Sequence, residues 1–436
     1  MNGLSVGSQR KRGVIAAFLL CGFGLSPAFA LDSAEETAAL RADAEWLLDQ
    51  IETHYAYLDR FDGVNPARGA LGVDVNAIET RLDLLTFGEC ALNALKDHHA
   101  FMGLSTDRSP GLAPSHSDLW IDEVDGEYLI AEVRAGSPAQ RAGVRPGWRL
   151  ISVQGEPVDA AIDQLCGAPY VTAEERGFAA RMVAVGPRDR ARQLGFESRA
   201  GERVDLELAS LYQESRPWPG PITADTLDDG VLVLTAHNGL LEDGWRAAVD
   251  RVLADVSPTG VVLDLRDTPG GGNTLNARAL LGRFVSEQTG YQRHSVPSIE
   301  RRTGVRRAWL EEVAPLEPSL AGVPVAVIVG RWTGSMGEGT AIGFQAAADA
   351  TIVGTQMAQL RGAITDLVMP NTGWVVKLPT EALFHVDRTP REDVVPDILV
   401  PDVEANPETR ADRGVDAALA DVRRRARTPS SDSTRE

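Results

Sequence analysis

The sequence predicts a multidomain α+β chain, with a helical N-terminal domain, then a β-rich module, then a layered αβ core. Three observations support this. Apolar residues recur at helical spacing in the first hundred residues, and short apolar runs punctuated by glycines follow in the next hundred. Strand and helix patterns then alternate from about Ile222 to Val403. A length of 436 residues, 43% apolar and 24% charged, allows two or three globular domains.

Residues 1–30 are interpreted as a signal peptide. A basic start at 10–12 precedes a short apolar run, and Ala28-Phe29-Ala30 has the small-x-small pattern of a signal peptidase site. No later stretch approaches the roughly eighteen apolar residues of a membrane span. The mature protein is therefore expected to be exported to the periplasm or the extracellular space, without a membrane span.

The charge and the cysteines exclude several functions. A formal charge of -19 and a pI near 4.9 argue against binding to nucleic acid. The mature chain keeps Cys90 and Cys166, and the sequence leaves open whether they pair. Neither cysteine has metal-ligand spacing, and no Cys/His cluster suggests zinc, so no metal or organic cofactor is expected.

The region 31–104 is predicted to form the helical domain. Two apolar series at helical spacing are separated by the loop "FDGVNPARGALG". The series are Leu40, Ala44, Leu47, Leu48, Ile51 and Tyr55, and then Ile78, Leu82, Leu85, Leu92 and Leu95.

The region 105–212 carries strand signals, with "EYLIAEV" followed by "AGSPAQRAGVRPGWRLISVQGEPV". This stretch resembles a PDZ domain at Ser137-Pro138-Ala139, Ala142-Gly143 and Pro146-Gly147, although Trp148 replaces the usual aspartate. PDZ domains capture extended peptide ends at a sheet edge. No clear glycine-rich carboxylate loop precedes the motif, so a scaffold module without a ligand is the alternative.

The core is expected at 213–403, after the Pro-rich join "ESRPWPGPIT". Buried strands "GVLVLTAH", "GVVLDLR", "VPVAVIVG" and "ATIVG" alternate with helices "LEDGWRAAVDRVLADV", "NTLNARALLGRFV" and "GEGTAIGFQAAA". Residues 404–436 are expected to hold a helix and a polar tail.

Two strand ends carry the residues that could do chemistry. "VVLDLRDTPGGGN" ends in glycines, which allow backbone N–H groups to approach a reacting centre. "RWTGSMGEGTA" places Ser335 at a helix start, where N–H groups and the helix dipole favour negative charge. Ser335 and Glu338 also fit the capping box, so this serine is either a helix cap, a nucleophile or both.

A nucleophilic serine needs a base. The chain has three lysines, Lys11, Lys96 and Lys377, and the first leaves with the signal peptide. Histidine is better suited to proton transfer near neutral pH, and "ALKDHHAFM" places His98 and His99 after a helical run. The alternative is two surface histidines at a helix end.

The order of these features resembles the C-terminal processing peptidases, or tail-specific peptidases. A helical domain, a PDZ-like module, "DLRDTPGGG", "GSMGE" and "VVPDILV" follow one another as in that family. The resemblance implies serine endopeptidases with an αβ core related to the ClpP and crotonase folds. Asp267-Thr268 and Met336 depart from the family pattern, which often has asparagines and a small residue there.

The resemblance also implies which base is used. Where the lysine branch has Gly-Lys-Gly, this chain has Leu360 or Arg361, and arginine cannot act as a base. The branch that resembles tricorn-type core peptidases uses serine, histidine and glutamate, which match Ser335, His99 in Asp97-His98-His99, and Glu392 in "REDVVPD". His99 is then the general base and Glu392 the orienting carboxylate. The oxyanion donors are the backbone N–H groups of Gly270 or Gly271 and of Met336.

The sequence therefore predicts an exported serine endopeptidase. It would hydrolyse extended or C-terminal peptide segments through an acyl-enzyme, with a peptide or unfolded protein as partner. The alternatives are a catalytically silent periplasmic binding protein of the same fold and a PDZ-like adaptor. The substrate and the oligomeric state cannot be predicted.

Overall fold

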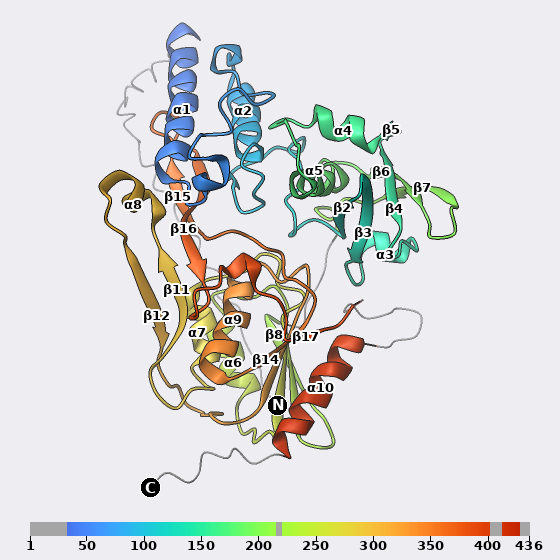
Figure 1. Cartoon of the computed structure of the whole chain (residues 1–436), viewed down its shortest axis with the longest axis vertical. Helices are drawn as coiled ribbons and strands as arrows, with labels where there is room; N and C mark the ends of the chain where they lie inside the picture. The colour runs from blue at the N-terminus through green and yellow to red at the C-terminus, as the bar shows by residue number, and fades with distance from the viewer. Residues whose placement is uncertain (1–32, 215–219, 402–411, 428–436) are drawn as a thin grey trace, which may run out of the picture.

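A computed structural model describes residues 33–214, 220–401 and 412–427. The expected signal peptide, half of the Pro-rich join (215–219), residues 402–411 and the end of the polar tail lie outside the described residues. Three bodies share the described chain: helices at the top of Figure 1, a β-rich module beside them, and an αβ core below. This mixed αβ architecture is the predicted fold class.

The first body contains helices α1 (Ser33–His54) and α2 (Arg81–Asn93), with 3-10 turns η1 (Leu58–Phe61) and η2 (Val75–Ala77) between them. Thr80 and Asp83 form a capping box that fixes the start of α2. All residues of the predicted apolar series except Leu82 join this core, and Leu82 is 48% exposed.

A hairpin from far along the chain completes this first body. Strands β15 (Ala363–Val368) and β16 (Val375–Phe384) leave the αβ core, and β16 pairs with β1 (Phe101–Met102). Val376 and Leu378 join the helical core, and buried Asp43 of α1 accepts hydrogen bonds from the hairpin turn. The helical region thus folds together with residues 363–384, which the boundary expected at residue 104 did not include.

The second body is the β-rich module. Its sheet has the order β2-β3-β4-β6-β7, with β5 paired to β4, and its helices are α3, α4 and α5. The bounds are β2 (Leu119–Val124), β3 (Glu127–Val133), β4 (Arg149–Val153), β5 (Glu156–Pro157), β6 (Arg192–Glu197), β7 (Arg203–Leu208), α3 (Pro138–Arg141), α4 (Val158–Gln164) and α5 (Ala173–Val185). A disulfide between Cys90 and Cys166 ties this module to α2, which settles the pairing that the sequence left open.

The third body is built on a sheet of order β17-β14-β13-β10-β9-β8, parallel except for β8 against β9. Its strands are β8 (Ile222–Thr226), β9 (Val231–Ala236), β10 (Gly260–Asp264), β13 (Val325–Val329), β14 (Thr351–Gly354) and β17 (Ile398–Leu399). Its helices are α6 (Trp245–Val252), α7 (Thr274–Leu281), α9 (Met336–Ala348) and α10 (Arg413–Ala426).

Both faces of this sheet are covered, because alternate residues pack in opposite directions. Val261 and Val327 join the core formed by α6, α7 and α9, whereas Val262 and Ile328 pack against α10. Burial on both faces explains why the predicted strands are nearly continuous apolar runs.

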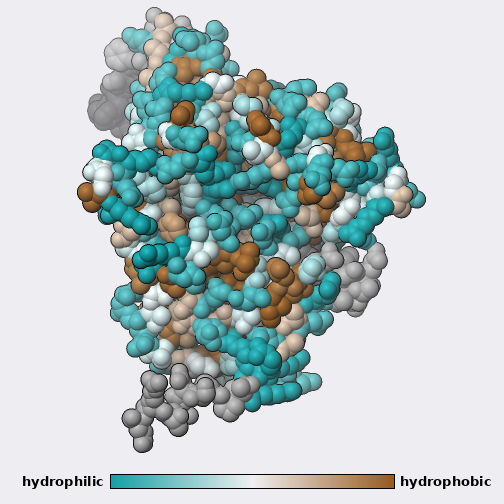
Figure 2. Space-filling view, in the orientation of Figure 1, coloured by the Kyte–Doolittle hydropathy of each residue, from teal (hydrophilic) through white to brown (hydrophobic). Residues whose placement is uncertain are grey.

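An arm extends from the core at the left of Figure 1, with β11 (Thr289–Ser295), α8 (Pro297–Thr303) and β12 (Ala308–Val313). Its strands join the hairpin in a sheet of order β1-β16-β11-β12, which the sequence did not predict. Figure 2 shows apolar residues on this face of the molecule as separate patches among hydrophilic ones. Within the described residues, no helix has both the length and the apolar character needed to cross a bilayer.

Candidate active site

Ser335 lies in the sharp turn between β13 and α9, with φ 51° and ψ -115°. Non-glycine residues seldom adopt such a conformation, and it is typical of sites where the surrounding structure holds a reactive side chain in place. The Ser335 N–H donates to the Glu338 carboxylate at 2.8 Å, as the capping box predicted for Glu338. Ser335 is therefore both the start of a helix and a strained residue.

His99 lies against this serine. The Nε2 atom of His99 is 3.0 Å from the Oγ atom of Ser335. The loop that carries His99 is fixed by Asp97, whose carboxylate accepts the His99 N–H at 2.9 Å and the Tyr55 hydroxyl at 2.8 Å. Two residues far apart in the sequence are thus held within hydrogen-bond reach.

The other ring nitrogen of His99 sets its tautomer. Nδ1 lies 2.7 Å from the backbone carbonyl oxygen of Arg361, and a carbonyl only accepts. Nδ1 therefore carries the proton and donates, which leaves Nε2 free to accept the Ser335 proton. Burial, assisted by the Arg391 charge, lowers the pKa of His99 to about 4, so the ring is neutral at pH 7.

Glu392 is not bonded to this ring. It lies in the turn η3 (Arg391–Asp393), and its Oε2 atom is buried with no hydrogen-bond partner among the described residues. Burial raises the pKa of Glu392. The structure therefore brings together Ser335 and His99, whereas the Arg361 carbonyl occupies the place at Nδ1 that was predicted for Glu392.

Neither lysine of the described chain contacts Ser335. Lys377 pairs with Asp366 at 2.6 Å across the β15–β16 hairpin. The Nζ atom of Lys96 lies over the rings of Phe61 and Tyr170. The lysine mechanism that the sequence disfavoured has no geometric support here.

The predicted oxyanion donors differ in availability. The Gly270 N–H donates to the side chain of Asn238 at 2.8 Å, and the Gly271 N–H donates to the Thr268 carbonyl at 3.0 Å. Neither glycine therefore offers a free donor in this form. The Met336 N–H, at the start of α9, has no acceptor among the described residues.

Gly271 is nevertheless required beside the serine. A Cβ atom on Gly271 would lie 2.4 Å from the Cβ atom and 2.9 Å from the Oγ atom of Ser335. The same atom would lie 2.8 Å from the Met336 nitrogen. With φ +61°, this position also favours glycine by its backbone conformation. The glycine run thus lets two loops meet at the nucleophile.

The β-rich module supports both of these loops. Arg134 pairs with Asp267 of the glycine-rich loop at 2.6 Å. Trp332, three residues before the serine, donates to the Ser117 carbonyl at 2.9 Å and packs against Trp120 of β2. The departure at Asp267 from the family pattern is therefore compensated by a cation from the module.

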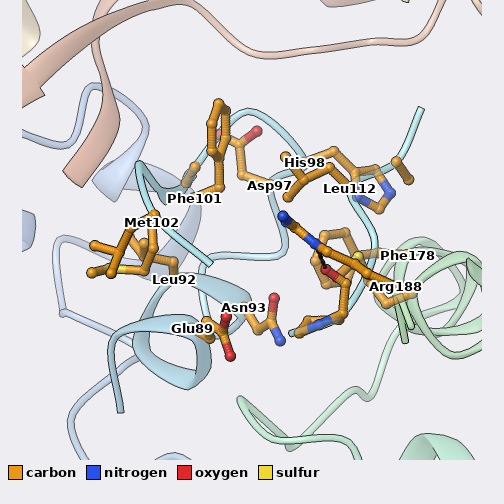
Figure 3. Close-up of a pocket in the computed structure, with 15 residues that line it drawn as sticks. Glu89, Leu92, Asn93, Asp97, His98, Phe101, Met102, Leu112, Phe178 and Arg188 are labelled. Atoms are coloured by element: carbon orange, nitrogen blue, oxygen red, sulfur yellow. Dashed lines mark hydrogen bonds between the residues drawn. The ribbon is translucent and has the colours of Figure 1, made fainter. Parts of the chain in front are cut away.

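A mainly apolar cavity lies behind the loop that carries the base. Figure 3 shows Asp97 and His98 on one side, with Leu92 and Met102 from the helical body and Phe178 from α5 around them. The His98 ring is half-buried and stacks on Phe178 of α5, so it is not the exposed histidine of the alternative interpretation. In the part of the chain that is described, no group of His, Cys, Asp or Glu is arranged to hold a metal.

Sequence reasoning missed three contributors, namely the Arg361 carbonyl, the Asn238 side chain and Arg391. A backbone carbonyl has no side-chain signature, and Asn238 stands in an ordinary loop. Arg391 directly precedes Glu392 in "REDVVPD", so the motif marked the place but not the residue.

Comparison with known proteins indicates which class of protein has this fold and site. Residues 229–400 match the sequence profile of peptidase family S41. The fold resembles the photosystem II D1 C-terminal processing protease, with 15% identity, a TM-score of 0.53, and coverage of 87% of this chain and 98% of that one. It also resembles mature CPAF, with 15% identity, a TM-score of 0.54, and coverage of 88% and 96%.

A curated relative, the probable periplasmic serine endoprotease DegP-like of Rhizobium meliloti (strain 1021), is 29% identical over 111 residues. The match covers 26% of this chain and 19% of that protein, about a fifth of its length. The fold and the matched domain define a serine-type peptidase. The chain therefore carries a domain that matches peptidase family S41, and this domain spans the motifs "DLRDTPGGG", "GSMGE" and "VVPDILV" on which the resemblance found in the sequence rests.

Proposed function

We propose that this protein hydrolyses peptide bonds through an acyl-enzyme formed on Ser335, with His99 as the general base. The observation that carries the proposal is the 3.0 Å contact between the Ser335 hydroxyl and the Nε2 atom of His99. The ring has the tautomer that a base requires, because the Arg361 carbonyl holds the proton on Nδ1.

In the acylation step, Ser335 Oγ attacks the carbonyl carbon while its proton passes to Nε2 of His99. The tetrahedral intermediate then breaks its C–N bond, and the imidazolium returns that proton to the leaving amine. A water molecule gives a proton to the same nitrogen and attacks the ester carbon, the C–O bond to Ser335 breaks, and the imidazolium returns the proton to Ser335 Oγ as the acid leaves. Glu392 would stabilise the imidazolium as the third member, since its buried Oε2 atom has no partner among the described residues.

The oxyanion would be bound first by the Met336 N–H, where the α9 dipole also favours negative charge. A second donor from Gly270 or Gly271 requires the glycine-rich loop to release one of its internal hydrogen bonds. This form is then a resting arrangement that substrate binding completes.

The proposed substrate is an extended or C-terminal peptide segment, because a chain must be unfolded to reach a nucleophile between three bodies. The β-rich module, taken as PDZ-like, is proposed to border that path. Export is supported by the basic and apolar character of residues 1–30 and by the Cys90–Cys166 disulfide, which persists in oxidising compartments.

Two observations favour a silent binding protein instead. Both predicted glycine donors are engaged internally, and no carboxylate of the described residues is hydrogen-bonded to the His99 ring. Such a site could hold a peptide without cleaving it.

Reaction of the full mature chain with an uncharged fluorophosphonate tests the proposal. We expect the wild type to be labelled at Ser335, Ser335→Ala to be unlabelled, and His99→Ala to lose at least about a hundredfold in rate. Glu392→Gln should lose less than His99→Ala, because the carbonyl still orients the ring. Folded wild-type protein that stays unlabelled, alone or with candidate peptides, would favour the binding protein.

A further inference from the structure

Arg391 is a buried cation that the proposed reaction leaves without a role. It is 2% exposed, and its Nη2 atom donates to the Leu360 carbonyl at 2.6 Å and to the Gly362 carbonyl at 2.9 Å. These two carbonyls flank Arg361, whose own carbonyl accepts the Nδ1 proton of His99. One guanidinium thus holds the peptide groups on both sides of the group that orients the base.

The same guanidinium also reaches the support of the nucleophile. Arg391 Nη2 lies 3.7 Å from the Oε2 atom of Glu338, a side chain that is fully buried. That oxygen accepts the N–H of Ser335 at 2.8 Å. An unbroken chain of contacts therefore runs from the Nδ1 atom of His99 through Arg391 and Glu338 to the backbone of Ser335.

Stability alone does not account for this arrangement. The Arg391 Nε atom and the Glu338 Oε1 atom are both buried without a hydrogen-bond partner among the described residues. A buried polar group left unpaired destabilises the folded state, and burial raises the pKa of Glu338 to about 8 although the Arg391 charge opposes the rise. Retention of such a pair next to a strained serine points to a role in the reaction.

We propose that Arg391 is a positioning residue that couples the two members of the reactive pair, orienting His99 through the 360–362 peptide groups and Ser335 through Glu338. The inference rests on the proposed function, because it assigns a role within the same reaction. Arginine suits this role, since its planar fork serves several acceptors at once, whereas a lysine ammonium is a single point charge.

The Arg391 charge adds a second effect that can be measured. The charged groups that face His99 are Asp97 from its own loop, which raises the pKa of His99, and Arg391 from η3, which lowers it. Burial is the largest cause of the low pKa. Removing the guanidinium should therefore raise the pKa of His99, so that the base becomes protonated at a higher pH.

The test measures the second-order rate constant for fluorophosphonate labelling of the full chain as a function of pH. The acid limb of this profile is the range in which the labelling rate falls because His99 becomes protonated. For Arg391→Met we expect the labelling rate above the acid limb to fall by about tenfold to a hundredfold, because Ser335 and His99 are misplaced. The acid limb should also move upward by about one pH unit. Arg391→Lys should keep the limb near its wild-type position but not recover the full rate.

Two further variants separate positioning from folding. Arg391→Met with Glu338→Gln leaves no unpaired buried charge and should show the same limb shift if Arg391→Met alone folds poorly. Arg192→Met removes a fully buried arginine of the β-rich module that binds Asp118 and the Ala184 and Ala209 carbonyls. This control should lower the melting temperature without moving the limb.

The outcomes are distinguishable. Wild-type protein that is never labelled would overturn the proposed function itself. A labelled wild type, together with a folded Arg391→Met variant whose limb and rate match it, would overturn the inference and leave the reaction in place. A limb shift of equal size in Arg192→Met would also overturn it.

Discussion

At the scale of single residues, the reactive serine carries a conformational cost. With φ 51° and ψ -115°, Ser335 lies in a region that non-glycine residues occupy at a cost of about 1–3 kcal/mol. The cost is tolerated because the turn aims the hydroxyl at His99 rather than along the helix. Stability and reactivity are therefore opposed at this position.

Replacing Ser335 tests this opposition. We expect Ser335→Gly to be more stable than Ser335→Ala by about 1 kcal/mol, because glycine accepts positive φ without the Cβ clash. Denaturant unfolding of both variants measures the difference. The same pair of substitutions at Ser295, the last residue of β11 and paired to strands on both sides, should show the reverse order, since glycine weakens a strand. If the glycine variant were the more stable one at both positions, or at neither, the backbone strain assigned to Ser335 would be contradicted.

Gly271 offers a second test at this scale. Gly271→Ala places a Cβ atom 2.4 Å from that of Ser335, so the two loops must separate and labelling should fall by about a hundredfold or more. Gly304→Ala is a matched control with φ +71° and open space around the added atom. It should lose about 1 kcal/mol of stability and keep its labelling rate. Equal labelling rates for Gly271→Ala and Gly304→Ala would contradict the close approach of Gly271 to Ser335.

At the scale of elements, the sequence predicted the strands that are buried on both faces. β10 and β13 are continuous apolar runs and were recognised. β12 and β15 were missed because they are largely exposed and carry polar residues, and β11 was missed because several of its buried residues are polar. The hairpin contacts that complete the helical body join residues more than two hundred positions apart, and no local pattern encodes them.

The same limit applies within the site. Ser335 and His99 were found because motifs placed both side chains, and the structure brings them together. The Arg361 carbonyl and the buried guanidinium of Arg391 were not found, because neither backbone orientation nor burial can be inferred from residue type.

The arm sheet contains a titratable contact with its own prediction. The His294 ring lies between Glu381 at 2.8 Å and Glu311 at 3.2 Å, and it stacks on Trp309. Burial lowers the pKa of His294, but the hydrogen bonds to both carboxylates outweigh burial and raise it above the usual value. The protonated ring therefore joins β11, β12 and β16.

Because the folded-state pKa is raised, this stabilisation is complete below about pH 6.5 and is lost as the pH rises through the folded value. The difference in unfolding free energy between wild type and His294→Gln should be about 1–2 kcal/mol at pH 6 and should shrink toward pH 9. His237→Gln is the control with the opposite slope, since burial lowers the pKa of His237. Parallel slopes for the two variants would contradict the assignment.

At the scale of the whole molecule, the three bodies are tied together at the site. The β15–β16 hairpin joins the core to the helical body, and Arg134 joins the β-rich module to the glycine-rich loop. The module is bound to α2 by the disulfide, and to the loop that precedes α2 by reciprocal backbone hydrogen bonds between Leu71 and the 167–168 segment. Since α2 leads directly to His99, the position of the module and the position of the base are mechanically linked.

Removing the disulfide tests this link. The bridge joins cysteines separated by 76 positions, and loops of this size typically gain about 2–4 kcal/mol from closure. Cys90→Ala with Cys166→Ala should therefore unfold at lower denaturant, and hydrogen exchange should rise first in β2–β7 and at the end of α2. Fluorophosphonate labelling should fall in the same variant at temperatures where the core remains folded, because His99 loses its fixed loop. Wild-type protein treated with reductant should show the same changes in unfolding, hydrogen exchange and labelling, once alkylation has verified that both thiols are free. An unchanged exchange pattern in both would show that backbone contacts alone hold the module, and that the base is positioned independently of it.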